Sequence, residues 1–398
     1  MTPDLPRRPN IIRTPKNGSK FMSHYLSRRE LLKRSGIVVG TGVLAPKLLL
    51  GSNSPEGQST RPDSSVRLSL NENPYGPSPD VVRTVQLELG KLNRYADETL
   101  SRRFAEQVAA YEQVSVDQVV LGEILEVLGL YLAKSGGTGS EFMYSTPGYL
   151  ALIDAAASAG GIGVPVPLNA RYQNDLTTLK SKINARTRAI YLINPHNPTG
   201  TINDDQEFKS FLRESGRQAV VIVDEAYLEY TSDFSARSAV SLVREGANVV
   251  VFRTFDKIHG LAGMPIGYAL APRTLADELR KQGVGAAEDL GRLNLVGASA
   301  ALADTAQVEK TRKTVAEERA LWLSVLSELK LPHTDAQANF VFFDAGRPQP
   351  TLAAAMRERA VDIGRAHPPY TNWARITIGL PAENRLAQTA LRAALKQS

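Results

Sequence analysis

Three side chains that could do chemistry, Asn197, Asp224 and Lys257, each stand at the carboxyl end of an apolar, β-branched run. In parallel α/β sheets, ligand sites form beyond the carboxyl ends of the strands, because these ends meet at one edge. An amide, a carboxylate and an amine would therefore converge on one crevice. Each alone has an ordinary explanation as a turn residue, a helix cap or a surface charge, but together they indicate a site.

This combination of groups suits catalysis with pyridoxal phosphate (PLP). A lysine can bind the aldehyde of the cofactor as a Schiff base, and a carboxylate against the pyridine nitrogen keeps that nitrogen protonated, so that the ring acts as an electron sink. The phenolic oxygen of the ring needs hydrogen-bond donors, which an Asn amide and a Tyr hydroxyl can supply. Asn197 and Tyr227 follow two of the runs and provide these two groups.

The chain that positions these residues alternates β-type runs with helical stretches from about residue 117. Most runs are continuously apolar, as in strands buried on both faces of a mostly parallel sheet. Helical segments such as 205–215 separate them and indicate βαβ units. The last hundred residues differ, with a long helix at about 305–329, short strands and closing helices, which indicates a smaller α+β domain. The predicted strands are 118–121, 141–145, 188–194, 218–226, 248–255, 266–270, 339–343 and 375–379.

The formal net charge of +6 is concentrated at the N-terminus of the 398-residue chain. Residues 1–60 hold ten Lys/Arg and three acidic residues, which leaves 37 basic and 38 acidic residues for the remainder. The globular part is nearly neutral, so a nucleic-acid partner has no electrostatic support. The absence of cysteine excludes disulfides, and the five histidines show no metal-ligand spacing, so no metal is expected.

The segment 27–46 resembles a twin-arginine export signal. Arg28 and Arg29 precede a short, Gly-rich apolar stretch that is too short to span a bilayer, which takes ~20 apolar residues. We therefore expect a periplasmic or extracytoplasmic protein without a stable membrane span, or a cytoplasmic one if the leader does not function. The sequence leaves open whether the leader is cleaved and whether translation starts at Met1 or Met22.

From about residue 67 to its end, the chain resembles the class I/II, fold-type I aminotransferases, and most closely their histidinol-phosphate aminotransferase branch. The resemblance covers many ordered motifs and is therefore specific for the family. These motifs are SLNENPYGPSP (69–79), RYADETLSRRF (94–104), STPGYLAL (145–152), NPHNPTG (194–200), DEAYLEY (224–230), RTFDKIHGLAGMPIGY (253–268), ANFVFF (338–343) and RITIGLPAEN (375–384).

This resemblance implies an α/β protein of the PLP-dependent transferase fold type I, with helices on both faces of a mostly parallel central sheet and a smaller α+β domain. We expect a leader and linker at 1–60, a small domain formed by 61–97 and 290–398, and a large PLP-binding domain at 98–289. A homodimer acting on small molecules is implied as well.

The implied activity is that of a PLP-dependent aminotransferase, moving an amino group between an amino acid, or an amino-alcohol phosphate such as histidinol phosphate, and a 2-oxo acid. Two alternatives stay open: a PLP-dependent decarboxylase, lyase or oxidase on the same fold, and a non-catalytic binding protein. Retention of Lys257, Asp224, Asn197 and Tyr227 argues against the second alternative. Export would separate the enzyme from a cytoplasmic pathway of histidine biosynthesis, which argues against a role in that pathway.

The resemblance assigns the cofactor's ring to five residues. Lys257 would be the Schiff-base lysine and would carry the proton between the substrate's Cα and the cofactor's C4′, for which its amine must be neutral. Asp224 would pair with the pyridinium, while Asn197 and Tyr227 would hold the phenolic oxygen. Tyr149 would stack on the ring.

The resemblance assigns the remaining contacts to the phosphate and the substrate. Thr254 would donate to the phosphate, and Tyr95 would reach the phosphate of the partner subunit's cofactor. Arg375 matches the arginine that clamps the substrate's acidic group in bidentate fashion. Positions at or beside the substrate's far end are matched by Tyr75, Arg365 and Asn339.

On the phosphate side, the sequence departs from the family pattern at three places. The family has serine before the lysine and arginine eight residues after it, whereas this chain has Asp256 and Pro265. The family also has a Gly-Ser-type helix start whose N–H groups cradle the phosphate. Here Gly122 is followed at once by Glu123, so this loop is shortened.

A carboxylate at position 256 conflicts with a phosphate group. At ~6 Å, each charge pair would cost on the order of 3 kcal/mol at an effective dielectric of ~20. Asp256 must therefore turn away, pair with Arg253 or His259, or face a site that holds phosphate weakly.

Overall fold

The computed structural model describes residues 65–396. These residues belong to one compact unit, Arg61–Ser398. The predicted export leader lies outside the described residues. Within residues 65–396, no helix is long and apolar enough to cross a membrane.

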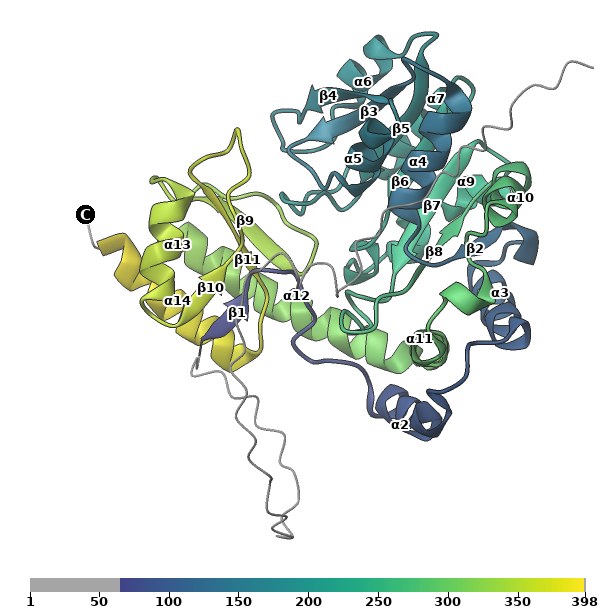
Figure 1. Ribbon diagram of the computed structural model, residues 1–398. Helices are drawn as coiled ribbons and strands as arrows, with labels where there is room; N and C mark the ends of the chain where they lie inside the picture. The colour runs from purple at the N-terminus through teal and green to yellow at the C-terminus, as the bar shows by residue number, and fades with distance from the viewer. Residues whose placement is uncertain (1–64, 397–398) are drawn as a thin grey trace, which may run out of the picture. The chain divides into compact units, whose positions relative to one another are not determined.

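A seven-stranded sheet forms the centre of the larger part of this unit (Figure 1). Its strand order is β2-β8-β7-β6-β5-β3-β4, and only β8 runs antiparallel to its neighbours. The parallel strands therefore present their carboxyl ends at one edge, as the sequence predicted. The strands are β2 (Val119–Leu121), β3 (Glu141–Thr146), β4 (Ile162–Pro167), β5 (Thr187–Ile193), β6 (Val220–Asp224), β7 (Val249–Thr254) and β8 (Gly267–Leu270).

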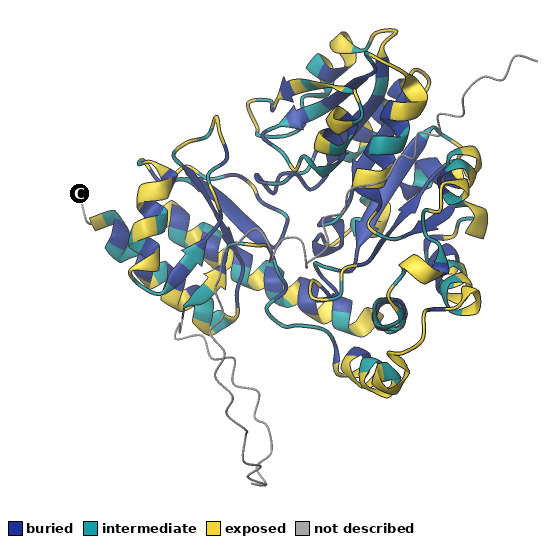
Figure 2. Cartoon of the chain, viewed as in Figure 1, coloured by how far each residue is buried: buried dark blue, intermediate teal, exposed yellow. Residues whose placement is uncertain are grey.

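Both faces of this sheet are buried (Figure 2). Successive side chains of a strand point to opposite faces, so Val249 and Val251 of β7 join one hydrophobic core while Val250 and Phe252 join another. This explains why the runs are continuously apolar rather than alternating. The predicted α/β fold with a mostly parallel central sheet is confirmed.

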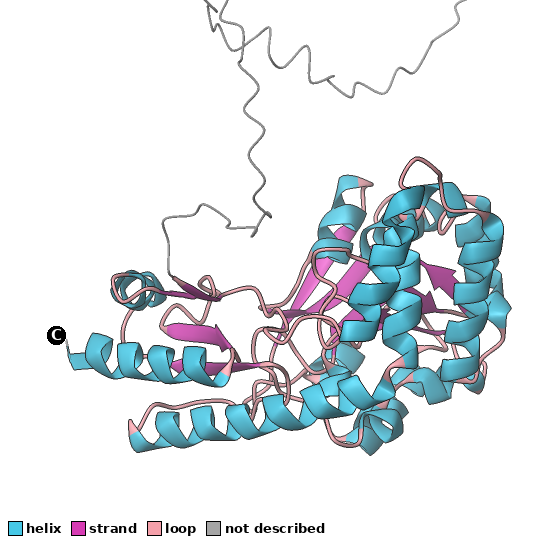
Figure 3. Ribbon diagram, turned by 90° about the horizontal axis from the view of Figure 1, so that it is seen from below, coloured by secondary structure: helices cyan, strands magenta, loops and turns pink. Residues whose placement is uncertain are grey.

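Helices enclose the sheet (Figure 3). Side chains of α4, α5 and α10 fill the core that contains Phe252, and side chains of α2, α3, α6, α7, α9 and α11 fill the other. These helices are α2 (Pro79–Glu88), α3 (Glu98–Glu112), α4 (Ile124–Gly136), α5 (Ala151–Ser158), α6 (Leu176–Lys182), α7 (Asp205–Ser215), α9 (Val240–Arg244), α10 (Arg273–Lys281) and α11 (Arg292–Ala303). The short helix α8 spans Phe234–Arg237, and 3-10 turns are η1 (Leu89–Lys91), η2 (Val116–Gln118), η3 (Leu228–Tyr230) and η4 (Ala287–Asp289).

A third hydrophobic core belongs to two small sheets and three helices. β9 (Phe340–Asp344) pairs antiparallel with β11 (Trp373–Thr377), and β1 (Val66–Leu68) pairs parallel with β10 (Val361–Ile363). This is the predicted α+β composition, and the helix expected at about 305–329 spans Thr305–Glu328. The helices are α12 (Thr305–Glu328), α13 (Gln349–Arg357) and α14 (Pro381–Lys396).

The composition of these cores bears on the proposed division into domains. Leu68 and Val315 join the third core, in keeping with a small domain built from both ends of the described chain. Val81 of α2 and Leu295 of α11 instead pack in the core of the seven-stranded sheet. The division at 97 and 290 stays a proposal, and these contacts show that helices α2 and α11 pack with the large sheet.

Three strands were not predicted from the sequence: β1, β4 and β10. β1 and β10 have only three residues each, too few to show a period. β4 contains Pro165 and Pro167, which weaken a strand signal, and it lies at the sheet's edge, where proline is tolerated.

Candidate active site

A cavity of about 520 Å³ lies at the carboxyl ends of β5, β6 and β7. It gathers side chains that are far apart in the sequence, as expected from the parallel sheet. Eight of the predicted site residues line it: Tyr149, Asn197, Asp224, Tyr227, Thr254, Lys257, Arg365 and Arg375.

Asp224 ends strand β6 and is 4% exposed. Its Oδ2 accepts a hydrogen bond from the Tyr191 hydroxyl at 2.8 Å, and its Oδ1 accepts one from the Ala226 N–H at 3.0 Å. Burial raises the pKa of Asp224, while these two hydrogen bonds and the charge of Lys257 oppose the rise. The result is a fixed carboxylate aimed at the cavity, as a partner of a protonated ring nitrogen requires.

Two donors flank this carboxylate. The Nη1 of Arg375 donates to Asn197 Oδ1 at 2.7 Å, which orients the amide so that its Nδ2 group remains a donor. The Tyr227 hydroxyl accepts from Asn71 Nδ2 at 3.1 Å, so that its own O–H remains available to donate. Both side chains therefore suit an oxygen ligand such as a phenolate.

Lys257 stands just beyond β7, next to Asp256. Burial raises the pKa of Asp256, and the neighbouring Lys257 and a hydrogen bond with Thr254 oppose that rise. The Asp256 N–H donates to Thr254 Oγ1 at 3.1 Å, while Asp256 Oδ1 is buried without a partner in the described chain. The Thr254 hydroxyl, expected to serve a phosphate, thus accepts a hydrogen bond from the Asp256 backbone.

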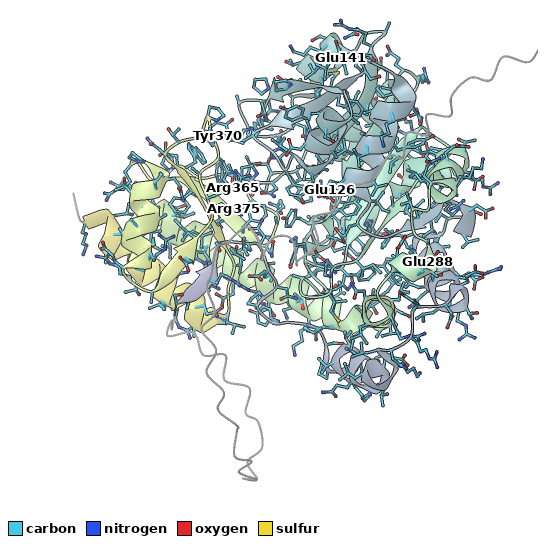
Figure 4. All side chains as sticks on the ribbon, viewed as in Figure 1. Glu126, Glu141, Glu288, Arg365, Tyr370 and Arg375 are labelled. Carbon is cyan, nitrogen blue, oxygen red and sulfur yellow. The ribbon has the colours of Figure 1, made fainter. Side chains whose placement is uncertain are left out.

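The opposite wall of the cavity is basic. Arg375, on β11, is 8% exposed, and its Nη2 donates to Ser69 O at 2.9 Å. Burial lowers the pKa of Arg375, and among residues 65–396 its Nε has no partner. Burial, then the charges of Arg375 and Arg365, lowers the pKa of His367 to about 3, so this imidazole is neutral. Figure 4 labels Arg365 and Arg375 on this wall and Glu126 on α4.

Three predicted site residues do not line the cavity. Asn339 is fully buried and donates from Nδ2 to the carbonyls of Asn71 and Glu72 at 3.0 and 3.3 Å, so it holds a backbone segment that borders the site. Tyr75 packs against the third core, that of the two small sheets. Tyr95 is 82% exposed and lies in a separate hollow. Their assigned roles stay predictions.

The comparisons with known proteins agree with this geometry. Residues 63–390 match the model of the family described as aminotransferase class I and II. The chain belongs to this family. Its similarity to "Histidinol-phosphate aminotransferase 1" of Psychrobacter arcticus is 33% identity over 340 residues, covering 83% of this chain and 87% of that protein.

Other members of the family are similar to a comparable degree. An "aromatic amino acid aminotransferase" of Cutibacterium acnes is 32% identical over 343 residues, covering 84% of this chain and 94% of that protein. The structure of histidinol-phosphate aminotransferase from Sinorhizobium meliloti in complex with pyridoxal-5′-phosphate has a TM-score of 0.75 and 26% identity, covering 84% of this chain and 91% of that one. The predicted fold, the enzyme class and PLP as the cofactor of this family are confirmed.

The cavity of this aminotransferase fits the ring of PLP better than its phosphate. On the ring side, Asp224 is fixed by two hydrogen bonds, and Asn197 and Tyr227 keep free donors, which is the donor set the ring needs. On the phosphate side, Glu123 and Asp256 line the cavity. Carboxylates are not ligands for a phosphate.

Both partners predicted for Asp256 from the sequence, Arg253 and His259, are wrong. Arg253 pairs with Glu112 at 3.1 Å and Glu225 at 3.0 Å, and His259 lies 3.4 Å from Glu229. The reason is the strand's period of two: Thr254 lines the cavity, so the preceding arginine points to the opposite face of β7.

Sequence reasoning assigned no role to several side chains of the site. In the sequence, Tyr191 is one more aromatic residue of a buried strand. Only its hydrogen bond links it to Asp224, the carboxylate expected to pair with the ring nitrogen. The shortened loop after Gly122 is apparent in the sequence. Its consequence, that two glutamates line the cavity, is apparent only in the structure. The residues concerned are Asn71, Glu123, Glu126, Tyr191 and His367.

Proposed function

We propose that this aminotransferase transfers the amino group of an amino acid, or of an amino-alcohol phosphate such as histidinol phosphate, to a 2-oxo acid, with Lys257 as its cofactor-binding residue. The observation that carries the proposal is the meeting of Lys257, Asp224, Asn197 and Tyr227 in one cavity. Relatives named for histidinol phosphate and for aromatic amino acids support both substrate classes.

Each of these residues has a separate task. Asp224 would keep the ring nitrogen protonated, and the Tyr191 hydrogen bond fixes this carboxylate in place. Asn197 and Tyr227 would donate to the phenolic oxygen, and Tyr149 would cover the ring. When bound, PLP supplies an electron sink that stabilises negative charge at the substrate's Cα. Lys257, with its amine neutral, would carry the proton between the substrate's Cα and the cofactor's C4′.

The basic wall binds the substrate's acidic group. Arg375 is buried and therefore poorly solvated, which strengthens a hydrogen-bonded pair with a carboxylate. Its Nη1 and Nη2 already hold Asn197 and Ser69, so the guanidinium is fixed in orientation before the substrate arrives. Arg365 is exposed and lies in the same cavity, where it faces the substrate's distal end.

A homodimer is part of the proposal. Helix α2 and the turn after it expose Leu87 at 74% and Leu92 at 63%, and Tyr95 follows at 82%. Apolar side chains exposed together are typical of a surface that is covered in an assembly. A partner seated there would bring its Tyr95 toward this subunit's cofactor. Sedimentation of the purified protein tests this, and a monomer at micromolar concentration contradicts it.

Export to the periplasm or beyond is proposed from the sequence of the leader. Replacing Arg28 and Arg29 by Lys should retain the protein in the cytoplasm, because the twin arginine is the recognised element. Cell fractionation with an immunoblot measures this. A wild-type protein found wholly in the cytoplasm would contradict the proposal.

Covalent trapping tests the central assignment. Purified protein with PLP should develop a visible absorption band, and borohydride should fix the cofactor on the peptide that contains Lys257. Lys257→Ala should abolish this adduct, whereas Lys281→Ala, which removes an exposed lysine of α10, should not. Absorption changes on adding amino acids one at a time would then identify the amino donor. An adduct on another lysine would sink the assignment.

A further inference from the structure

The cavity ends at the amino terminus of α4, where the chain has an unusual connection. Only Gly122 and Glu123 join β2 to α4, which starts at Ile124. The backbone of Gly122 has φ of 121°, a conformation that favours glycine. A helix amino terminus exposes unpaired N–H groups and a positive dipole end, which favour an anion. Here Glu123 and, one turn on, Glu126 put the chain's own carboxylates at that place.

Asp256 adds a third carboxylate to this end of the cavity. Its carboxyl has one oxygen buried without a partner in residues 65–396. Burial, followed by the negative charge of Asp256, raises the pKa of Glu123 to about 7, with Glu126 and Asp224 adding to the rise and Lys257 opposing it. The side chains of Glu123 and Glu126 line the cavity but are exposed to water. We call Glu123, Glu126 and Asp256 the acidic end.

Lys257 offsets the negative charge of the acidic end only in part. Within the described chain, the cavity is lined by three Lys or Arg residues. Lys257 is needed at the aldehyde of the cofactor, and Arg365 and Arg375 belong to the opposite wall. Arg253, the nearest arginine in the sequence, is bound between Glu112 and Glu225.

A phosphate group would therefore meet repulsion where it needs donors. It carries a charge of about −1.5 to −2 near pH 7, and each carboxylate at a few ångströms weakens its binding by about tenfold or more. The residues assigned to the ring, Asp224, Asn197 and Tyr227, are different ones from those of the acidic end. We infer that this chain holds its cofactor by the ring and Lys257 and only weakly by the phosphate, so that pyridoxal without phosphate binds nearly as tightly as PLP. This inference rests on the proposed function.

Parallel titrations of the full chain with PLP and with pyridoxal test the inference. Absorption gives each Kd, and borohydride followed by peptide mass spectrometry verifies attachment to Lys257. At pH 8 the two Kd values should lie within about tenfold of each other. PLP binding more than a hundredfold tighter than pyridoxal, with both on Lys257, would overturn the inference and leave the proposed function intact. Failure of both ligands to attach to Lys257 would overturn both.

The pH dependence of the Kd ratio isolates the acidic end. Lowering the pH from 8 to 6 protonates Glu123 and reduces the charge of the phosphate, so the ratio should shift in favour of PLP. Changes in the contacts to the ring, which PLP and pyridoxal share, cancel in the ratio. A ratio that does not change with pH would count against the inference.

Charge-removing variants give the second arm. Asp256→Ser and Glu123→Gln should each shift the Kd ratio toward PLP by about tenfold. Glu207→Gln is the matched control, because Glu207 is an exposed glutamate in the first turn of α7, outside the cavity. It should leave the ratio unchanged. Variants Asp256→Ser and Glu123→Gln that both retain the wild-type ratio would overturn the inference, and the wild-type ratio remains decisive if either fails to fold.

Discussion

The two walls of the cavity differ in charge and in construction. The acidic end is formed by Glu123, Glu126 and Asp256 on connections of the large sheet, while the basic wall is formed by Arg365, His367 and Arg375 near β11. The guanidinium of Arg375 is held by Asn197 and Ser69, whereas one oxygen of Asp256 is buried without a partner in the described chain. A cation that neutral acceptors hold in place can receive an anionic ligand, whereas neighbouring carboxylates repel one.

Removal of the buried cation should have the largest effect. Arg375→Ala should lower kcat/KM for a carboxylate-bearing substrate by roughly 30- to 5,000-fold, corresponding to about 2–5 kcal/mol for a buried, hydrogen-bonded charge pair. Arg365→Ala should lose less than about fivefold, because an exposed ion pair contributes about 1 kcal/mol or less. Steady-state kinetics measures both. An unchanged kcat/KM in Arg375→Ala would remove this residue from the site.

Acidification should lower the free energy of unfolding of the protein through His367, on the basic wall. Its pKa falls from 6.5 in the unfolded chain to about 3 in the folded one, so the unfolded state binds more protons and stability is lost as pH falls from 6.5 toward 3. His367→Leu should remove this loss, about 1–2 kcal/mol at pH 5, while changing little at pH 8. Thermal melts at the two pH values measure it. An equal change in Tm at both values would contradict the assignment.

Between the two walls, Tyr191 fixes the carboxylate of Asp224. Tyr191→Phe removes this hydrogen bond from a buried carboxylate and should reduce the affinity for the cofactor or the turnover by about tenfold, from a loss of about 1–2 kcal/mol. Tyr144→Phe, on neighbouring strand β3 and outside the cavity, is a matched control that should retain both. Cofactor titration and kinetics distinguish the two variants. Equal cofactor affinity and equal turnover in the two variants would show that the Tyr191–Asp224 hydrogen bond contributes to neither.

Glu123, in the acidic end, should lower the free energy of unfolding as the pH rises. This is opposite in sign to the effect of His367 and smaller. The folded-state pKa of Glu123, about 7, lies above the unfolded value of 4.5, so stability is lost as pH rises from 4.5 to 7. Glu123→Gln should therefore raise Tm at pH 8 but hardly at pH 5. Solvent access limits the gain to about 1 kcal/mol or a few degrees. A lower Tm at pH 8 would show that Glu123 stabilises the start of α4.

The sequence by itself determined where the chemistry lies. Asn197, Asp224 and Lys257 each follow a continuously apolar run, and strand polarity alone required their side chains to meet at one edge. Local composition was sufficient because parallel strands buried on both faces have a distinctive pattern. It also revealed Asp256 and the short loop at Gly122 as departures on the phosphate side.

Only the tertiary structure decided which charges share a wall. Arg253 is three residues from Asp256 in sequence, yet the strand's period of two turns it to Glu112 and Glu225 on the other face. Tyr191 reaches Asp224 from an adjacent strand because β5 and β6 are paired in register. Such contacts depend on register and packing between distant segments, which the residue types along the chain do not specify.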